Sequence, residues 1–217
     1  MILLPVKNLA NAKQRLAPVL DARSRAELAR TMLFDVLTTL SKWPDRPEIA
    51  LVTSDGAAVQ LARFFGFSVI PDDENLSETD AIAAATLLCE TGGATETLII
   101  PADIPLLQVW ELERIFQEAP EEGCVLVPSS DGRGTNAVLR RPAGLFPLRF
   151  GNDSFEPHLA AANATQKPSV VLNLPGIALD IDLPADLHEL LASPGETRSQ
   201  RLLRRWNVDE LPLAANE

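Results

Sequence analysis

Residues 97–107 read Thr97-Leu98-Ile99-Ile100-Pro101-Ala102-Asp103-Ile104-Pro105-Leu106-Leu107. The apolar run follows polar and glycine-rich residues and predicts a short buried strand, which Pro101 ends because proline has no backbone N–H to donate. Asp103 therefore follows the carboxyl end of a strand. In an open parallel α/β sheet, ligands bind at this edge, although an aspartate beside a proline is also common in an ordinary turn.

Strands and helices alternate along the chain up to this stretch. Apolar runs predict strands, and apolar residues spaced three and four apart, with Asp21 as an N-cap and Gly66 as a left-handed C-cap, predict the helices between them. The predicted order is strand 2–6, a helix after 21, strand 48–53, helix 57–65, strand 67–70, a helix from 77 or 79 through 88, and strand 97–100. This alternation predicts right-handed crossovers and an α/β fold with a mainly parallel central sheet flanked by helices.

The second half of the chain changes character. Strands at 124–128 and 137–140 enclose a polar, glycine-containing loop and predict a small β-rich insertion. The other predicted elements are a helix at 111–118, an alanine-rich helix that contains His158, a strand at 169–172, an extended segment at 176–183 and a helix at 185–191. We expect one domain over residues 1–191. Residues 192–217 form a tail whose short amphipathic helix docks on that domain or on a second subunit, as in a homodimer.

Composition limits the functions that this chain can have. Its 217 residues include 30 acidic and 19 basic side chains, a formal net charge of -11. This charge repels polyanions and argues against a nucleic-acid polymer as partner. Cys89 and Cys124 lack the close spacing of a metal or redox pair. The sequence shows no signal peptide and no run of about 18 apolar residues, so we expect a cytoplasmic protein that does not enter a membrane.

Three cationic residues, Lys7, Lys13 and Arg15, lie in the polar loop that follows the first predicted strand. Such a loop can surround an anion with backbone amides and positive side chains. It contains no glycine, so it is neither a P-loop nor a dinucleotide fingerprint. A solvated basic loop is the alternative interpretation.

Two carboxylates stand one residue apart near the end of the predicted domain. In an extended segment, residues i and i+2 point to the same face, so Asp180 and Asp182 present two negative charges together. Two adjacent negative charges repel each other unless a cation binds both of them. Oxygen ligands suit Mg²⁺, or Mn²⁺, better than zinc. Asp182 also stands where it can cap the helix that begins at Pro184, but such a cap does not explain Asp180.

Two further segments carry groups that suit an anion. Thr135 and Asn136, at the end of a loop with two glycines, supply hydrogen-bonding side chains, as an ordinary hairpin loop also does. Gly151 and Ser154 precede a helix whose free amides favour a phosphate or a carboxylate. His158 lies a turn inside that helix, either as a ligand or as a structural histidine.

The cationic loop, Asp103 and the carboxylate pair together fit phosphoryl or nucleotidyl transfer. In these reactions cations neutralise phosphates, and a divalent metal bridges carboxylates to oxygens that gain charge. The chain has two histidines, His158 and His188, and no Ser-His-Asp or Cys-His set competes. If the nucleophile is an ionised phosphate or carboxylate, no general base is required, and positioning plus charge neutralisation can supply catalysis.

A series of short motifs follows a characteristic order over residues 2–190. They are Pro5-Val6-Lys7, Ala12-Lys13, Arg15-Leu16-Ala17-Pro18, Met32-Leu33-Phe34-Asp35-Val36, Pro101-Ala102-Asp103-Ile104-Pro105-Leu106, Gly134-Thr135-Asn136-Ala137, Phe150-Gly151, Ser154-Phe155, His158, Leu179-Asp180-Ile181-Asp182, Pro184 and Asp186-Leu187. In these motifs the chain resembles the 2-phospho-L-lactate guanylyltransferase family, which includes phosphoenolpyruvate guanylyltransferase. The family has a nucleotide-diphospho-sugar transferase-like (Rossmann-like) fold, so the resemblance makes residues 1–191 a nucleotidyltransferase domain.

The resemblance implies transfer of GMP from GTP to a three-carbon phosphoacid, with release of pyrophosphate, in the biosynthesis of coenzyme F-420. The acceptor within the family is phosphoenolpyruvate, 2-phospho-L-lactate or 3-phosphoglycerate. By position, three aspartates would hold Mg²⁺: Asp103, Asp180 and Asp182. The acceptor would be bound by Thr135, Gly151 and Ser154, beside Asn136. The catalytic residues expected to face the GTP phosphates are Lys7, Lys13 and Asp103, with Arg15 beside them.

Two departures and two alternatives accompany the resemblance. Residues 75–81 read Asn-Leu-Ser-Glu-Thr-Asp-Ala where the family has Gly-Leu-Asn-x-Ala, so the guanine pocket is not assigned, and Leu183 replaces a threonine. Another nucleotidyltransferase of the same fold, of the molybdenum-cofactor or sugar-phosphate type, is the first alternative, but it normally has a glycine-rich first loop. A non-catalytic nucleotide-binding module is the second, and the cost of keeping three carboxylates without a metal argues against it.

Overall fold

The computed structural model describes residues 1–72 and 77–208. These residues form a seven-stranded sheet with the strand order β3-β2-β1-β4-β6-β5-β7. The strands are β1 (Ile2–Pro5), β2 (Ile49–Val52), β3 (Ser68–Ile70), β4 (Thr97–Ile99), β5 (Gly123–Pro128), β6 (Thr135–Arg141) and β7 (Ser169–Val171). All neighbouring strands pair in parallel except β6, which runs antiparallel to both β4 and β5. The predicted mainly parallel sheet is confirmed.

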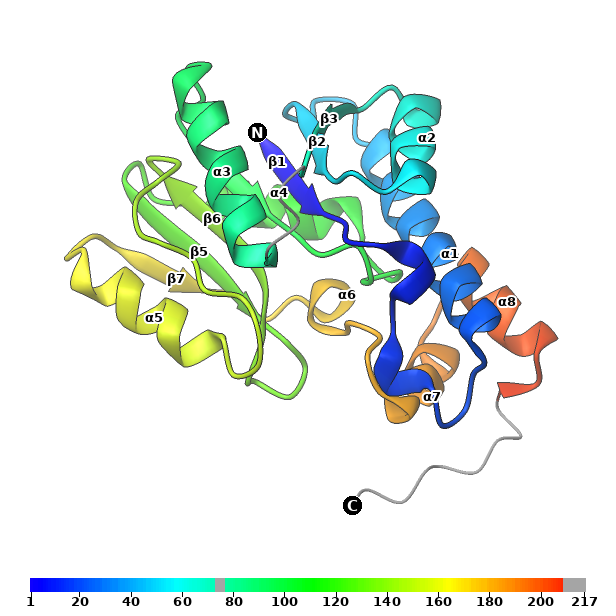
Figure 1. Cartoon of the computed structure of the whole chain (residues 1–217). Coiled ribbons are helices and arrows are strands. Elements are labelled where there is room, and N and C mark those ends of the chain that lie inside the picture. The colour runs from blue at the N-terminus through cyan, green and yellow to red at the C-terminus, as the bar shows by residue number, and fades with distance from the viewer. Residues whose placement is uncertain (73–76, 209–217) are drawn as a thin grey trace.

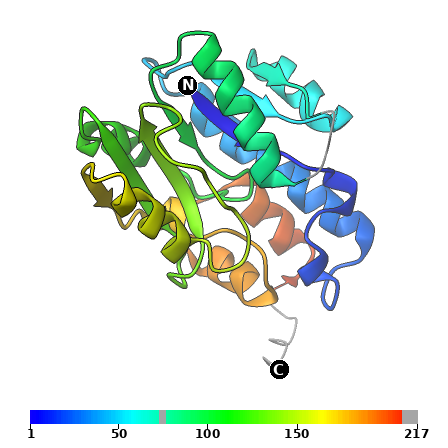
Figure 2. The same cartoon turned by 60° about the vertical axis from the view of Figure 1, so that its left-hand side comes forward.

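Helices cover both faces of this sheet (Figure 1). They are α1 (Ala22–Ser41), α2 (Gly56–Phe65), α3 (Glu78–Thr91), α4 (Val109–Glu118), α5 (Phe155–Ala164), α6 (Pro175–Ala178), α7 (Pro184–Ala192) and α8 (Arg198–Arg205), with short 3-10 helices η1 (Leu9–Asn11) and η2 (Gln14–Leu16). Helices α3 and α5 pack on one face, and α1, α2 and α4 pack on the other (Figure 2). Since alternate strand residues point to opposite faces, Leu4 belongs to the core beneath α1 and Leu3 to the core beneath α3.

Local side-chain chemistry fixes the helix ends where the sequence predicted them. Asp21 accepts a hydrogen bond from the backbone N–H of Ser24 at 2.7 Å, and Ser77 accepts one from Asp80 at 3.1 Å, so each caps the first turn of its helix. Gly66 ends α2 with φ +73°, a left-handed conformation that costs glycine little. These caps start α1 and α3 and end α2 close to the predicted boundaries.

The predicted β-rich insertion is part of the central sheet. Strands β5 and β6 form an antiparallel pair between β4 and β7 and make no separate layer. Thr135 and Asn136, expected in the preceding loop, begin β6 because Thr135 pairs with Pro128. Since β6 runs against its neighbours, its amino end lies at the edge where β1 and β4 have their carboxyl ends. This placement brings Thr135 and Asn136 to the predicted ligand edge.

The expected extended segment 176–183 is only partly extended. Residues Pro175–Ala178 form α6, because a proline at the first position suits a helix start. The following residues carry no ladder strand, although the Ile181 N–H donates to the Asp103 carbonyl at 3.1 Å. Ile181 is fully buried between the partly exposed Asp180 and Asp182. The alternation expected of an extended backbone therefore holds for these three residues.

Helix α8 docks on its own chain, one of the two predicted options. Leu202 and Leu203 are buried in a core cluster with side chains of α1 and α7. At the start of α8, the buried Asp35 carboxylate of α1 accepts from the Arg198 N–H at 3.0 Å, the Ser199 N–H at 2.8 Å and the Ser199 hydroxyl at 2.7 Å. Three donors on one carboxylate offset its desolvation and fix α8 against α1.

Among residues 1–72 and 77–208, no helix has the length and apolar character needed to cross a bilayer. Asn75 and Leu76, which begin the unassigned guanine-pocket segment, lie outside the described residues.

Candidate active site

A cleft of about 480 Å³ opens at the carboxyl edge of the parallel strands. Its walls come from η2, the start of α3, the loops after β4 and β5, the start of β6, the loop before α5 and the segment that leads into α7 and its first turn. Eight of the residues predicted from the sequence line it: Arg15, Asp103, Thr135, Asn136, Gly151, Ser154, Asp180 and Asp182. The fold thus brings together segments that are up to about 170 residues apart in the chain.

Lys13 connects two of the predicted carboxylates at this cleft. Its Nζ donates to Asp182 Oδ1 at 2.8 Å and makes a still shorter contact with Asp103 Oδ2. Lys13 stands between η1 and η2 in a left-handed conformation, with φ +57°. Only 9% of its side chain is exposed. Burial by itself lowers the pKa of the Lys13 amine, but the charges of Asp103 and Asp182 outweigh burial and raise that pKa above its ordinary value, so the amine stays charged.

Asp180 also lines the cleft, and its carboxylate contacts an amide side chain instead of the Lys13 amine. Its Oδ1 accepts from Asn136 Nδ2 at 2.9 Å. Burial, followed by the nearby charge of Asp103, raises the pKa of Asp180 to about 6. The amide nitrogen of Asn136 also donates to the carbonyls of Ile177 at 2.9 Å and Ala178 at 3.0 Å. These contacts make Asn136 a support for Asp180 and α6, and its role in substrate binding stays a prediction.

The donor set at this point suits a hard cation. Asp103 Oδ1 is buried and has no hydrogen-bond partner among the described residues, which leaves its lone pairs available. Asp180 and Asp182 add carboxylate oxygens, the ligand type that Mg²⁺ and Mn²⁺ prefer. In the described part of the chain no three acidic or other metal-binding side chains stand ready around one point, and the Lys13 amine lies between Asp103 and Asp182. The residue types therefore suit a divalent cation, whereas in this structure the Lys13 amine pairs with two of the three carboxylates.

The loops before β6 and α5 add hydrogen-bonding groups to the lining, together with the charged side chains of Asp131, Arg133 and Asp153. The Thr135 N–H donates to Ser154 Oγ at 3.0 Å, and both side chains are buried at the floor of the cleft. Gly151 has φ +130° and open space around the position of a Cβ atom, so a larger side chain there would be strained and would project into that space. His158, behind Thr135, is a buried histidine with both ring nitrogens in hydrogen-bonding contact.

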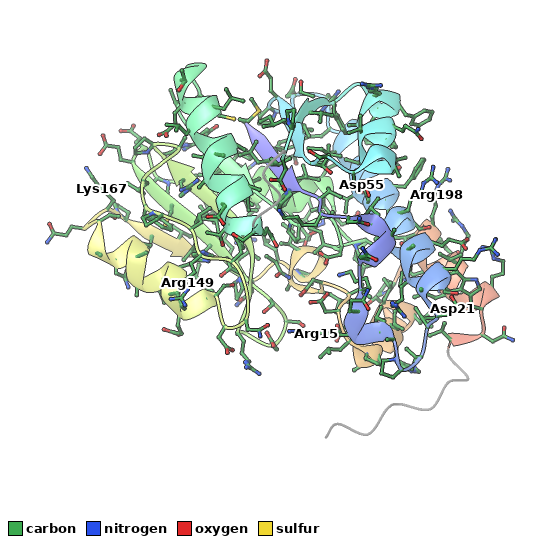
Figure 3. All side chains as sticks on the ribbon, viewed as in Figure 1. Arg15, Asp21, Asp55, Arg149, Lys167 and Arg198 are labelled. Carbon is green, nitrogen blue, oxygen red and sulfur yellow. The ribbon has the colours of Figure 1, made fainter. Side chains whose placement is uncertain are left out.

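Arg15 and Lys7 differ in position. Arg15 lies where the N-terminal loop faces the loop before α5 (Figure 3), with its Nη2 donating to Asn152 Oδ1 at 2.8 Å and its Nη1 3.8 Å from Asp182 Oδ2. Lys7 is not among the described residues that line the cleft, and its amine pairs with Asp72 at 2.6 Å. The predicted role of Lys7 at the GTP phosphates therefore stays a prediction.

Four acidic residues that were not predicted from the sequence as site residues also line the cleft: Glu78, Asp131, Asp153 and Asp186. Burial, followed by the charge of Asp103, raises the pKa of Glu78 in the first turn of α3 to about 7. Burial also raises the pKa of Asp186, which accepts the N–H groups of Asp182 at 2.8 Å and Leu183 at 2.6 Å. The signal for Glu78 in the sequence was its place one residue after the N-cap of a helix that follows a strand and a polar loop.

Comparison with known proteins decides the family. A family model described as guanylyl transferase CofC like matches residues 1–215. The chain belongs to this family of guanylyl transferases. It is 37% identical over 204 residues to the phosphoenolpyruvate guanylyltransferase of Roseiflexus castenholzii, which covers 94% of this chain and 93% of that relative. It is 28% identical over 207 residues to the 2-phospho-L-lactate guanylyltransferase of Methanobrevibacter smithii, with 95% and 90% covered.

The CofC-like guanylyl transferase also shares its fold with a solved structure. A proposed nucleotide-diphospho-sugar transferase from Desulfovibrio desulfuricans G20 superposes with a TM-score of 0.77 at 19% identity. The match covers 94% of this chain and 93% of that protein. The predicted nucleotide-diphospho-sugar transferase-like fold is confirmed.

Proposed function

We propose that this guanylyl transferase moves GMP from GTP to the phosphate of a three-carbon phosphoacid, with phosphoenolpyruvate as the first candidate. The observation that carries the proposal is a single cleft whose lining has two different parts. One part of the lining holds Asp103 and Asp182, which the buried, charged Lys13 bridges without itself lining the cleft, and another part holds Thr135 and Ser154. The first part suits the phosphates of a nucleotide and the second suits the anionic acceptor. Phosphoenolpyruvate ranks first because the Roseiflexus relative carries that name.

The proposed reaction is one displacement at phosphorus. A phosphate oxygen of the acceptor attacks the α-phosphorus of GTP, the bond from that phosphorus to the bridging oxygen of the β-phosphate breaks, and pyrophosphate leaves with the electron pair. The attacking oxygen is already ionised at neutral pH, so the step needs no general base. Catalysis then depends on alignment and on positive charge near the leaving group, which Lys13 and Arg15 are placed to supply.

We infer that Asp103, Asp180 and Asp182 hold Mg²⁺, with Mn²⁺ as the alternative. When bound there, the ion would supply positive charge to phosphate oxygens that gain charge in the transition state. The buried, unpartnered Asp103 Oδ1 supports this assignment. The raised pKa of Asp180 supports it as well, because an excess of negative charge around a buried carboxyl is relieved by a cation.

The acceptor determines where the enzyme acts in metabolism. 2-Phospho-L-lactate and 3-phosphoglycerate are the other candidates. 2-Phospho-L-lactate has a methyl group and no double bond, and 3-phosphoglycerate has a hydroxyl at C2 and its phosphate on C3. A few contacts decide between such ligands. With any of the three, the proposal places the enzyme in the cytoplasm, in the biosynthesis of coenzyme F-420 that the family resemblance implies.

The test is release of pyrophosphate from GTP and Mg²⁺ with each acid offered separately. We expect release with at least one acid, loss of release on adding EDTA, and much weaker release with ATP or CTP. Asp103→Asn should abolish release, and Asp45→Asn, an exposed aspartate after α1, is the matched control with the same chemical change. A folded wild type that binds GTP but releases no pyrophosphate with any acid would overturn the proposal.

A further inference from the structure

His158 of α5 makes two hydrogen-bonding contacts that together fix where its ring proton lies. Nε2 is 2.8 Å from the backbone nitrogen of Arg149, and Nδ1 is 2.9 Å from Oγ1 of Thr135. A backbone N–H can only donate, so Nε2 must be an acceptor and carries no proton. Burial, followed by the charge of Arg140, lowers the pKa of His158 to about 4, which agrees with a neutral ring at neutral pH.

The direction of the second contact follows from the first. A neutral imidazole has one N–H, and since Nε2 accepts from Arg149, that N–H lies on Nδ1. Nδ1 therefore donates to Thr135, and the Thr135 hydroxyl oxygen accepts. The opposite assignment would place an Nε2–H against the Arg149 N–H at 2.8 Å, which is two donors facing each other.

The hydroxyl of Ser154 is constrained in the same way. Its oxygen accepts from the Thr135 backbone N–H at 3.0 Å. In the described part of the chain no residue accepts the hydroxyl hydrogen of Thr135 or of Ser154, and both residues line the cleft. Each oxygen thus already has a protein donor, and each hydrogen is left for a ligand. Two adjacent hydroxyls that present donors match a group with acceptor oxygens only.

We propose that His158 is a positioning residue: it holds the Thr135 hydroxyl as a donor toward an oxyanion of the acceptor acid, which the family resemblance already places at Thr135 and Ser154. This inference rests on the proposed function and names the residue that orients the acceptor side of the cleft. The oxyanion is a carboxylate or a phosphate, because both present only acceptor oxygens at neutral pH. His158 does not touch the substrate, and it acts by keeping one rotamer of the Thr135 hydroxyl populated before the acid binds.

Two amide variants separate the functions of the two ring nitrogens. In His158→Asn the side-chain amide reaches the position of Nδ1 and can still donate to Thr135, whereas the acceptor for Arg149 is lost. In His158→Gln the longer side chain places its oxygen near the position of Nε2 and can still accept from Arg149, whereas the donor to Thr135 is lost. We expect KM for the acceptor acid to be roughly five- to tenfold higher in His158→Gln than in His158→Asn, the factor for one neutral hydrogen bond. KM for GTP should be the same in both variants.

A double-mutant comparison distinguishes positioning from a general loss of structure. In a Thr135→Val background there is no hydroxyl to orient, so His158→Gln should add no further increase to KM for the acid. Equal KM values for the acid in the two amide variants, or an effect of His158→Gln that persists fully in the Thr135→Val background, would overturn the proposal. A parallel rise in KM for GTP would also overturn it, because the residue would then act on the whole cleft.

A spectroscopic readout tests the tautomer without relying on activity. The chain has two histidines, so His188→Gln leaves His158 as the only imidazole in a ¹⁵N spectrum and serves as the control variant with unchanged turnover. We expect a pyrrole-like shift for Nδ1 and a pyridine-like shift for Nε2, constant between pH 6 and pH 8. A proton on Nε2 would overturn the inference even if the enzyme is active. If no acid supports pyrophosphate release but this spectrum is found, the proposed function fails while the oriented Thr135 hydroxyl stands.

Discussion

Replacing Asp180 with asparagine should make the metal-free protein more stable while it abolishes turnover. Asp180→Asn keeps the oxygen that accepts from Asn136 and removes only the negative charge. In the folded protein, burial and the charge of Asp103 raise the pKa of Asp180 from 3.8 to about 6, which corresponds to about 3 kcal/mol of unfavourable free energy for the charged form. Partial solvent screening of this side chain reduces the expected gain to about 1.5–3 kcal/mol.

The sign of the pH dependence follows from the direction of this shift. The folded state holds the Asp180 proton to a higher pH than the unfolded chain does, so stability is lost as pH rises from about 4 to about 6 and stays lost at higher pH. The advantage of Asp180→Asn should therefore be complete at pH 7.5 and nearly absent at pH 4. For a chain of this size, the gain at pH 7.5 corresponds to a rise in Tm of about 3–12 °C.

The assay is thermal and urea unfolding of both proteins at the two pH values, with EDTA present, and the same measurement in excess Mg²⁺. Mg²⁺ should stabilise the wild type and should stabilise Asp180→Asn much less, because one carboxylate ligand is gone. Asp45→Asn, at an exposed position, is the control and should change the unfolding free energy by less than about 0.5 kcal/mol. An equal or lower stability of Asp180→Asn at pH 7.5, or a gain of the same size at pH 4, would refute the reasoning.

Four further substitutions test other contacts of the cleft and of α8. Asp103→Asn or Asp182→Asn should lower turnover about 100-fold or more, since each removes a charge and keeps the shape, and should cost less stability than Lys13→Met because the remaining aspartate still pairs with Lys13. Wild-type turnover in either variant would contradict the metal assignment. Lys13→Met leaves two carboxylates without the cation that they share. We expect the free energy of unfolding, measured with urea in the presence of EDTA, to fall by about 2–4 kcal/mol. An unchanged urea midpoint would contradict a stabilising role for the contacts of Lys13. Asp35→Ala removes the acceptor of three hydrogen bonds at the start of α8. It should lower the free energy of unfolding by about 2–3 kcal/mol and leave turnover at 25 °C unchanged. A loss of turnover without a loss of stability would contradict this purely structural role of Asp35.

Much of the fold was accessible from the sequence because its signals are local. Asp21, Ser77 and Gly66 act on the turn of helix next to them, and short apolar runs mark the parallel strands. The errors concern the start of a hairpin strand and a four-residue helix, where the local signals are ambiguous. Thr135 and Asn136 belong to β6 because β5 lies beside them, and Pro175–Ala178 form a helix where an apolar run with glycine suggested a strand.

Eight of the predicted site residues line one cleft, and their roles stay predictions, whereas the contacts between them could not be predicted from the sequence. Asp103, Asp180 and Asp182 followed from their place after a strand and from their spacing. The bridge that Lys13 makes between Asp103 and Asp182 spans 90 and 169 residues of sequence, and no local pattern encodes such a pair. The same holds for Asp35, which belongs to the helical pattern of α1, yet its carboxylate accepts hydrogen bonds from the start of α8.

The central claim is that the cleft catalyses attack on the α-phosphorus of GTP by a phosphoacid. The most direct measurement follows two labelled forms of GTP in parallel reactions with Mg²⁺ and phosphoenolpyruvate, 2-phospho-L-lactate or 3-phosphoglycerate. The account predicts that label from the α-phosphate enters a new product that also contains the acid, and that label from the γ-phosphate leaves in pyrophosphate. Label from the γ-phosphate on the acid, or α-label that stays in GTP, GDP or GMP with every acid, would contradict it.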